Sequence, residues 1–211
     1  MNRPNKAQVA VKEEIISSPP KSRVRDRIMK TASDLFYRYG IHAVGVDAIA
    51  SAAGTNKMSF YRNFASKDDL VAEYLRAAER EGLRRWDETL AAHAGKPRLQ
   101  IESLFDVLVE NNCDEDSRGC ALANAAVEIT EPDHPARPVI EKYKADMRGR
   151  FRRLAQEMHA RNPDELGDSL MLLWEGAYLT RLTMGVLGPV QGAAKAARAL
   201  ISAYTEKVKS S

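Results

Sequence analysis

The sequence has little of what defines several classes of protein. Two cysteines in 211 residues are too few for the disulfide framework of a small secreted domain. No apolar run is long enough to cross a bilayer, and the first twenty residues hold no continuous apolar stretch of the kind found in a secretory signal. We therefore expect a cytoplasmic protein that does not bind a membrane, with residues 1–20 as a flexible tail.

Sequence motifs of the common enzyme classes are also missing. The glycines do not form a phosphate-binding loop or a dinucleotide fingerprint, and no Gly-x-Ser-x-Gly, His-Glu-x-x-His or Cys-x-x-Cys occurs. Cys113, Cys120 and His134 do not have the spacing of a known metal-ligand set. The sequence thus predicts no catalytic residues, no metal and no cofactor, and it favours a binding protein over an enzyme.

Helical periodicity is what the sequence does contain, from one end to the other. Apolar residues recur at steps of three and four, and no segment alternates in the manner of a strand. Glycine and proline separate the periodic segments, so we expect an all-α fold. Apart from two short helices between residues 46 and 64, the predicted helices cover about 24–39, 67–93, 97–110, 119–130, 135–158 or 138–158, 163–187 and 193–208.

The two short helices carry the most specific pattern in the chain. Ile49, Ala50 and Ala53 form one apolar face, and Gly54 follows where a helix-ending residue is needed. After the turn, Phe60 and Phe64 lie four apart on the second helix. Two short helices joined by a tight glycine turn are typical of the helix-turn-helix unit, whose second helix can enter the major groove of DNA.

The distribution of charge supports a DNA partner. Residues 21–64 contain eight Lys or Arg against three Asp, a net charge of +5, whereas the whole chain carries only +3. Positive charge is therefore concentrated on the segment that would lie against phosphates.

Residues 25–70 resemble the tetracycline-repressor (TetR) family of bacterial one-component regulators. The pattern is Phe-x-x-x-Gly at the end of a first helix, then Ile-Ala-x-x-Ala-Gly, Tyr-x-x-Phe and Lys-x-x-Leu. The resemblance implies a three-helix DNA-binding domain (21–66) followed by a larger helical domain for ligand binding and dimerisation (67–211). It also implies a repressor that binds a palindromic double-stranded DNA operator as a homodimer through the last two helices, and that a small molecule releases. The predicted DNA-binding residues are Arg23, Arg25, Thr55, Asn56, Lys57, Ser59, Tyr61, Arg62 and Lys67, of which Asn56, Lys57 and Ser59 are the candidates for base edges.

The effector of such a repressor would bind among the helices that follow residue 67. Aromatic, small or amide side chains that could line this pocket, or serve simply as core, are Phe105, Cys120, Asn124, Tyr143, Trp174 and Tyr178.

Two alternatives remain open. Cys113 and Cys120 flank Arg118, and a thiolate near a guanidinium is more reactive than an ordinary thiol, so the regulator could sense oxidants or electrophiles through Cys120. A non-specific architectural DNA-binding protein is the second alternative, although it would be expected to carry a higher net charge than +3.

Overall fold

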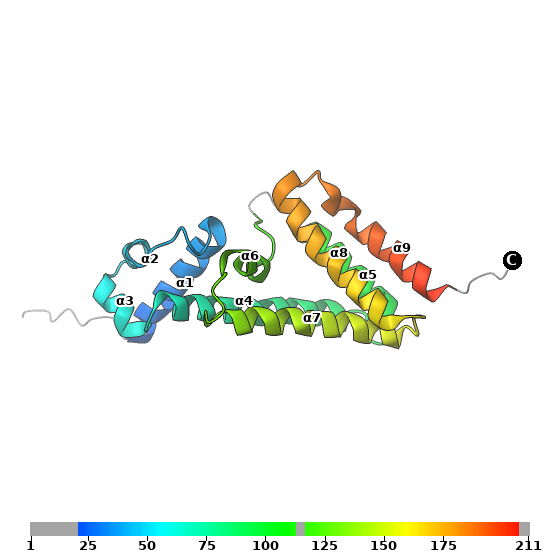
Figure 1. The fold of residues 1–211 in the computed structure, drawn as a ribbon, viewed down its shortest axis with the longest axis horizontal. Helices are drawn as coiled ribbons and strands as arrows, with labels where there is room; N and C mark the ends of the chain where they lie inside the picture. The colour runs from blue at the N-terminus through cyan, green and yellow to red at the C-terminus, as the bar shows by residue number, and fades with distance from the viewer. Residues whose placement is uncertain (1–20, 113–116, 207–211) are drawn as a thin grey trace, which may run out of the picture.

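The computed structural model describes residues 21–112 and 117–206, and this part of the chain is helical with no strand (Figure 1). The predicted all-α fold is confirmed. The tail 1–20 and Cys113 lie outside the described residues. The elements are α1 (Lys21–Tyr39), α2 (Val46–Ala52), α3 (Lys57–Asn63), α4 (Lys67–Ala91), α5 (Pro97–Asn111), α6 (Ala121–Glu128), α7 (Arg137–Glu157), α8 (Pro163–Met184), the 3-10 helix η1 (Pro189–Gly192) and α9 (Ala193–Thr205).

Helix ends follow the glycine and proline signals, with small corrections to the predicted boundaries. Helix α6 begins at Ala121 and not near 119, since Gly119 has a φ of +71° that a right-handed helix excludes. Helix α8 ends at Met184 because Gly185 has a φ of +75°, so it is three residues shorter than predicted. The turn η1 after Gly188 was not predicted, and α9 ends at Thr205 instead of 208.

Helix α4 connects the two ends of the elongated molecule (Figure 1). Its first turns pack against α1, and its later turns pack against α5 and α7. Helices α1, α2 and α3 contact one another at one end, and α8 contacts α7 and α9 at the other. Helix α6 lies between these two groups and contacts α4 and α7 (Figure 1).

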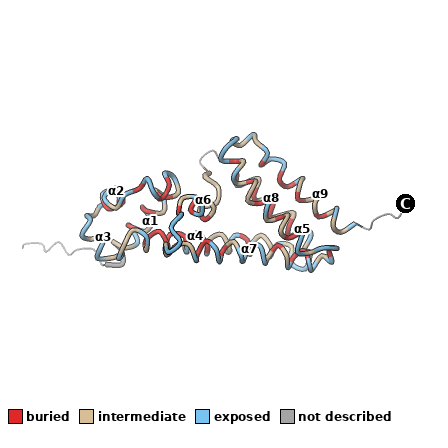
Figure 2. Tube along the Cα trace, viewed as in Figure 1, coloured by how far each residue is buried: buried red, intermediate tan, exposed pale blue. Residues whose placement is uncertain are grey.

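Rings form the centre of the larger helical part. Phe105 and Phe151 are completely buried, and Trp86 and Trp174 are nearly so. Buried positions recur along the helices that carry them, α4, α5, α7 and α8 (Figure 2). The Trp86 ring meets the Phe151 ring edge-on, with 4.9 Å between centroids, and Trp174 contacts both phenylalanines. These four rings come from α4, α5, α7 and α8, so the cluster joins four helices.

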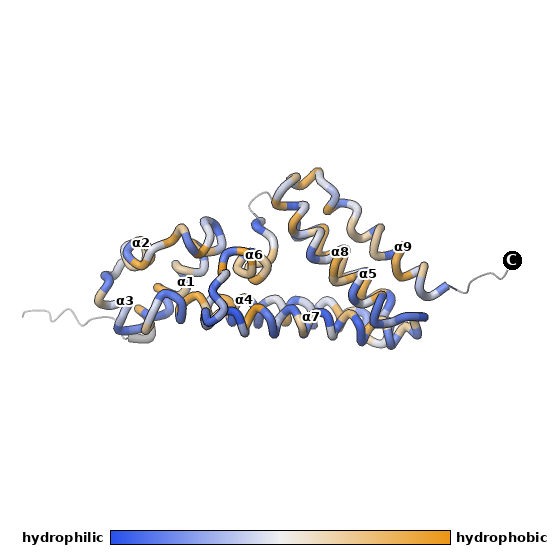
Figure 3. Tube along the Cα trace, viewed as in Figure 1, coloured by the Kyte–Doolittle hydropathy of each residue, from blue (hydrophilic) through white to orange (hydrophobic). Residues whose placement is uncertain are grey.

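One face of α8 is apolar and exposed. Leu172 and Leu179, two turns apart, are 74% and 62% exposed. Gly176 lies between them, and a Cβ added there would meet nothing within 4 Å. Leu182, Met184 and Leu187 are also exposed, at the end of the helix and beyond it. Hydrophobic positions recur along the length of α8 (Figure 3). Among the described helices, none combines the length and the apolar character needed to cross a membrane.

Candidate functional site

Helices α2 and α3 form the helix-turn-helix unit, and the pair of phenylalanines anchors it. Phe60 and Phe64 turn inward, 0% and 3% exposed, with 5.7 Å between ring centroids. The opposite face of α3 is open to solvent, where Tyr61 is 50% exposed beside exposed Lys57 and Arg62. The buried rings thus fix α3 on the domain while leaving a whole helix face available to a partner.

The turn before α3 is closed by hydrogen bonds within the protein. The Asn56 side-chain oxygen accepts a hydrogen bond of 2.9 Å from the Ser59 backbone N–H and caps α3. Half-exposed Thr55 donates its own N–H to the Ala50 carbonyl. Because its oxygen accepts the capping bond, the side-chain NH2 of Asn56 is the group that this bond leaves free for a base edge.

The basic side chains predicted to contact DNA differ in the interactions that they already make within the protein. Arg25 donates to both carboxylate oxygens of Glu73, at 2.6 and 2.5 Å, and lies over the Phe64 ring. Lys57 forms an exposed ion pair with Asp47 at 3.2 Å. Lys67 opens α4 and is half-buried, and this burial lowers its pKa from the ordinary lysine value. Arg23 and Arg62 are exposed.

Met58 belongs to the exposed face of α3, and the sequence reasoning missed it. Its side chain is 66% exposed, and its sulfur lies 3.5 Å from an Arg62 nitrogen. Its spacing from Tyr61 and Arg62, three and four residues, would have placed it on their face. An apolar side chain was overlooked because only polar positions were considered as DNA contacts.

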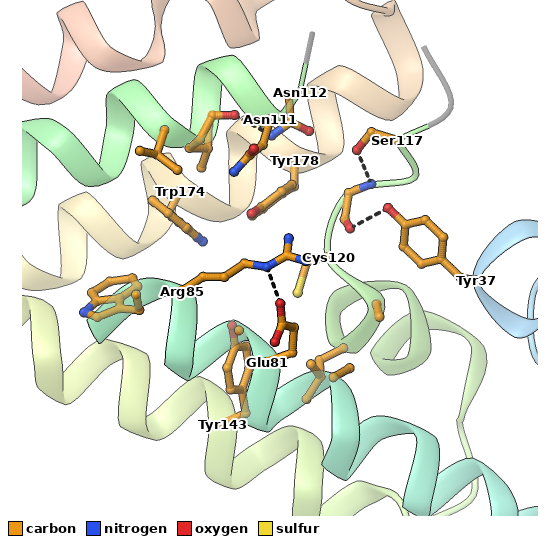
Figure 4. Close-up of a pocket in the computed structure, with 18 of the residues that line it drawn as sticks. Tyr37, Glu81, Arg85, Asn111, Asn112, Ser117, Cys120, Tyr143, Trp174 and Tyr178 are labelled. Carbon is orange, nitrogen blue, oxygen red and sulfur yellow. Dashed lines mark hydrogen bonds and ion pairs between the residues drawn. The ribbon is translucent and has the colours of Figure 1, made fainter. Parts of the chain in front are cut away.

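A cavity of about 660 Å³ lies in the larger helical part, with walls from α1, α4, α5, α7, α8 and the start of α6. Of the predicted ligand residues, Cys120, Tyr143, Trp174 and Tyr178 line it (Figure 4). Phe105 is buried behind it, edge-on to Trp174. Asn124 donates its amide to the Arg118 carbonyl at 2.8 Å and does not reach the cavity.

Charged residues also line the cavity, and the sequence gave no reason to select them. Arg85 donates from Nε to the Glu81 carboxylate at 2.6 Å, and Arg84 binds both oxygens of the same carboxylate at 2.9 and 2.7 Å. These bonds to Arg84 and Arg85 lower the pKa of Glu81 to about 2, so the carboxylate is ionised.

The phenol hydroxyls in the cavity remain protonated. Burial raises the pKa of Tyr143 and Tyr178 well above the ordinary tyrosine value.

The Cys120 sulfur also reaches the cavity, with Lys144 Nζ 3.8 Å away (Figure 4). Thiol sensing by Cys120 stays a prediction.

The segment that carries α6 connects the cavity to the helix-turn-helix domain. Before α6, the Tyr37 hydroxyl accepts from the Arg118 N–H at 2.9 Å and donates to the Gly119 carbonyl at 3.1 Å. At the end of α6, one Glu128 oxygen accepts from the Ile41 N–H at 2.6 Å and the His42 N–H at 3.0 Å. Hydrogen bonds at both ends of α6 therefore hold it to residues at the C-terminal end of α1 and just after it. Cys120, which directly precedes α6, lines the cavity.

Known proteins resemble this chain in sequence, most clearly over the helix-turn-helix domain. Residues 28–74 match the family described as bacterial regulatory proteins, tetR family. The HTH-type transcriptional activator FasR of Mycolicibacterium smegmatis is 31% identical over 119 residues, which is 54% of this chain and 51% of FasR, so the chain spans about half the length of that relative. The HTH-type transcriptional repressor DhaR of a Mycobacterium species is 24% identical over 163 residues, covering 74% of this chain and 81% of DhaR.

Solved structures resemble nearly the whole chain. A TetR-family transcriptional regulator from Streptomyces coelicolor has a TM-score of 0.80 at 26% identity, covering 88% of this chain and 97% of that one. A putative regulator of the same kind from Streptomyces avermitilis has a TM-score of 0.76 at 29% identity, covering 87% and 99%. The likeness extends beyond the helix-turn-helix domain to the helices that enclose the cavity.

Proposed function

We propose, since this chain belongs to the TetR family of transcriptional regulators, that it is a repressor that binds a two-fold symmetric operator as a homodimer and leaves it when a small molecule fills the cavity. The observation that carries the proposal is the face of α3, where Lys57, Met58 and Tyr61 stand exposed opposite two buried phenylalanines. Such a face fits a major groove, in which hydrogen-bonding and apolar groups both read base edges.

The exposed apolar face of α8 supports a dimer. Monomeric soluble proteins seldom expose a large contiguous apolar surface, so a second copy is the natural cover for Leu172 and Leu179. A two-fold axis would place one α3 in each of two half-sites, about 34–36 Å apart. One copy of α3 alone makes too few contacts for the affinity of a specific operator.

Selection of bound DNA from a random pool with the purified protein tests this function. A two-fold symmetric consensus of two half-sites is expected. Enrichment without symmetry would contradict the dimeric mode of binding. The absence of any enrichment, together with tight binding to every sequence, would favour a non-specific architectural role instead.

Ser59 and Lys67 are expected to serve different parts of the DNA. Ser59→Ala should change the base preference at one position of each half-site. The free-energy difference between the preferred base and the others at that position should fall by roughly 1–3 kcal/mol. Lys67→Ala should weaken binding to all sequences alike and lower the slope of affinity against salt, because a phosphate contact carries no sequence information. Competition binding against operator variants at several salt concentrations measures both effects. Identical behaviour of the two variants would refute this division of roles.

Glu128 is the residue through which we propose that α6 holds the DNA-binding domain. Its carboxylate provides the acceptor for two backbone N–H groups in the α1–α2 loop, at Ile41 and His42. A ligand that moves the start of α6 would act on this contact only by favouring one of two arrangements of the domains.

Glu128→Ala should increase hydrogen exchange at the Ile41 and His42 amides by at least about tenfold, because a hydrogen bond to a charged group is worth roughly 1.5–3 kcal/mol. Exchange measured by NMR resolves these two amides from their neighbours. Glu141→Ala is the matched control, since Glu141 is exposed on α7 and, among the residues that the structure describes, pairs with Arg137 alone. Unchanged exchange in Glu128→Ala would show that these two hydrogen bonds do not hold the loop.

A further inference from the structure

We propose that the cavity binds an aromatic carboxylate, with its carboxylate on Arg85 and its rings against Trp174, Tyr143 and Tyr178. The inference rests on the proposed ligand-responsive function and names the chemical class of the effector. It draws on three properties of the cavity walls: an arginine with unused donors, a surplus of neutral donors, and aromatic surfaces on two sides.

Arg85 supplies the positive charge. Its guanidinium extends into the cavity between Trp174 and Tyr143, toward the Cys120 sulfur (Figure 4). Only Nε is engaged, with Glu81; within the described part of the chain, neither terminal nitrogen of Arg85 has a hydrogen bond. Arg84 binds the other side of the same carboxylate and also pairs with Glu88, so what this wall offers an anion is the two terminal nitrogens of Arg85. A planar guanidinium with two unused nitrogens matches the geometry of a carboxylate.

Neutral donors surround this charge. The indole N–H of Trp174 turns toward the centre of the cavity, and the hydroxyls of Tyr143 and Tyr178 also lie there (Figure 4). No hydrogen bond within the described residues engages any of these three groups. An indole N–H donates only, and a phenol, which is protonated at neutral pH, can donate as well as accept; burial raises the pKa of Tyr143 and Tyr178 further. The cavity therefore suits a molecule rich in acceptor oxygens.

The aromatic rings of the cavity wall indicate what the rest of the ligand is, beyond its carboxylate. Trp174 lies edge-on to Tyr178, with 5.8 Å between centroids, and tilted against Trp86 at 5.4 Å. These rings come from α4 and α8, and Tyr143 adds a third from α7. A flat aromatic body can pair with such rings edge-on or offset, as aromatic side chains pair with one another. The volume of about 660 Å³ suits a molecule of a few fused rings.

Calorimetric titration of the full-length protein with three probes tests the inference. The probes are 2-naphthoate, its neutral isostere naphthalene-2-carboxamide, and decanoate, an anion with a similar number of carbon atoms and no ring. We expect 2-naphthoate to bind at least about tenfold more tightly than either of the other two. Equal affinity for naphthoate and the carboxamide would overturn the role of charge. Equal affinity for naphthoate and decanoate would overturn the role of the rings, and no binding of any probe would overturn the whole inference.

Arg85→Gln should reduce the affinity for naphthoate to that of the carboxamide and leave the carboxamide unchanged. Arg80→Gln is the matched control, because Arg80 is an exposed arginine of α4 that does not line the cavity, and the preference for naphthoate should persist in it. An Arg85→Gln protein that still prefers naphthoate would overturn the assignment. Operator binding without any probe separates the two proposals: intact operator binding without a carboxylate preference refutes only the ligand class, and failure to bind an operator refutes the proposed function.

Discussion

Replacing Leu179 by arginine is expected to yield a 23.5 kDa monomer and to weaken operator binding by at least about 100-fold. Leu179 lies in the middle of the exposed apolar face of α8, between Leu172 and Leu182. In a two-fold interface each substitution occurs twice, so two unpaired charges would be buried close to the axis. Each half-site would then be bound independently, without the avidity that links two copies of α3.

Sedimentation at micromolar concentration and operator titration measure the two effects on the same preparation. Val127→Arg is the matched control for mass, since Val127 is 81% exposed on α6, whose main contacts are with α4 and α7 and not with α8 or α9. It adds the same charge to an apolar surface and should stay dimeric. A wild-type protein that already sediments at 23.5 kDa would contradict the dimer itself.

Phe151→Ala is expected to reduce the free energy of unfolding by roughly 3–5 kcal/mol. Phe151 has no exposed surface, and its ring contacts the rings of Trp86, Phe105 and Trp174. Truncation would leave a void at the point where four helices meet, and the surrounding rings are too large to fill it without shifting their helices. The loss is a large part of the 5–15 kcal/mol that is usual for a folded domain.

Urea unfolding followed by circular dichroism measures this loss. The proteins must be compared at equal concentration, because dissociation of a dimer would contribute to the apparent stability. Tyr39→Ala removes an aromatic ring that is 63% exposed and should change the unfolding free energy by less than about 0.5 kcal/mol. Similar losses in the two variants would show that the ring cluster contributes no more than a surface residue does.

The helix-turn-helix unit was predictable because its signals are local. Phe60 and Phe64 bury one face of α3, Gly54 ends the turn with a φ of +63°, and Ser66 caps α4 through the Asp69 N–H. Each signal involves residues within a few positions of one another, and a single sequence records such relations directly. Asn56 shows where this reasoning was incomplete, because a residue before a helix can cap it as well as face a partner.

The cavity was only partly predictable because it depends on contacts between distant segments. Glu81 and Arg85 look like one more ion pair on a solvated helix face, and only the packing of α4 beneath α6 and α8 turns that face toward a cavity. Phe105 and Asn124 were also predicted as candidate lining residues, and neither lines the cavity. Helix periodicity gives the buried side of a helix, but it does not distinguish a side that meets another helix from one that meets a void.

Because α4 is continuous, a small movement of its turns at the cavity displaces its other end, next to the helix-turn-helix unit. Trp86 and Lys67 belong to one uninterrupted helix, nineteen residues apart, which corresponds to about 28 Å of helix axis. A tilt of roughly 5° about the Trp86 end would therefore carry Lys67 sideways by about 2.5 Å, the scale of a hydrogen bond. In a symmetric dimer the two displacements would add across the operator. A bound molecule that displaces a single turn of α4 would thus change the spacing of the two α3 helices, so that they no longer fit two half-sites.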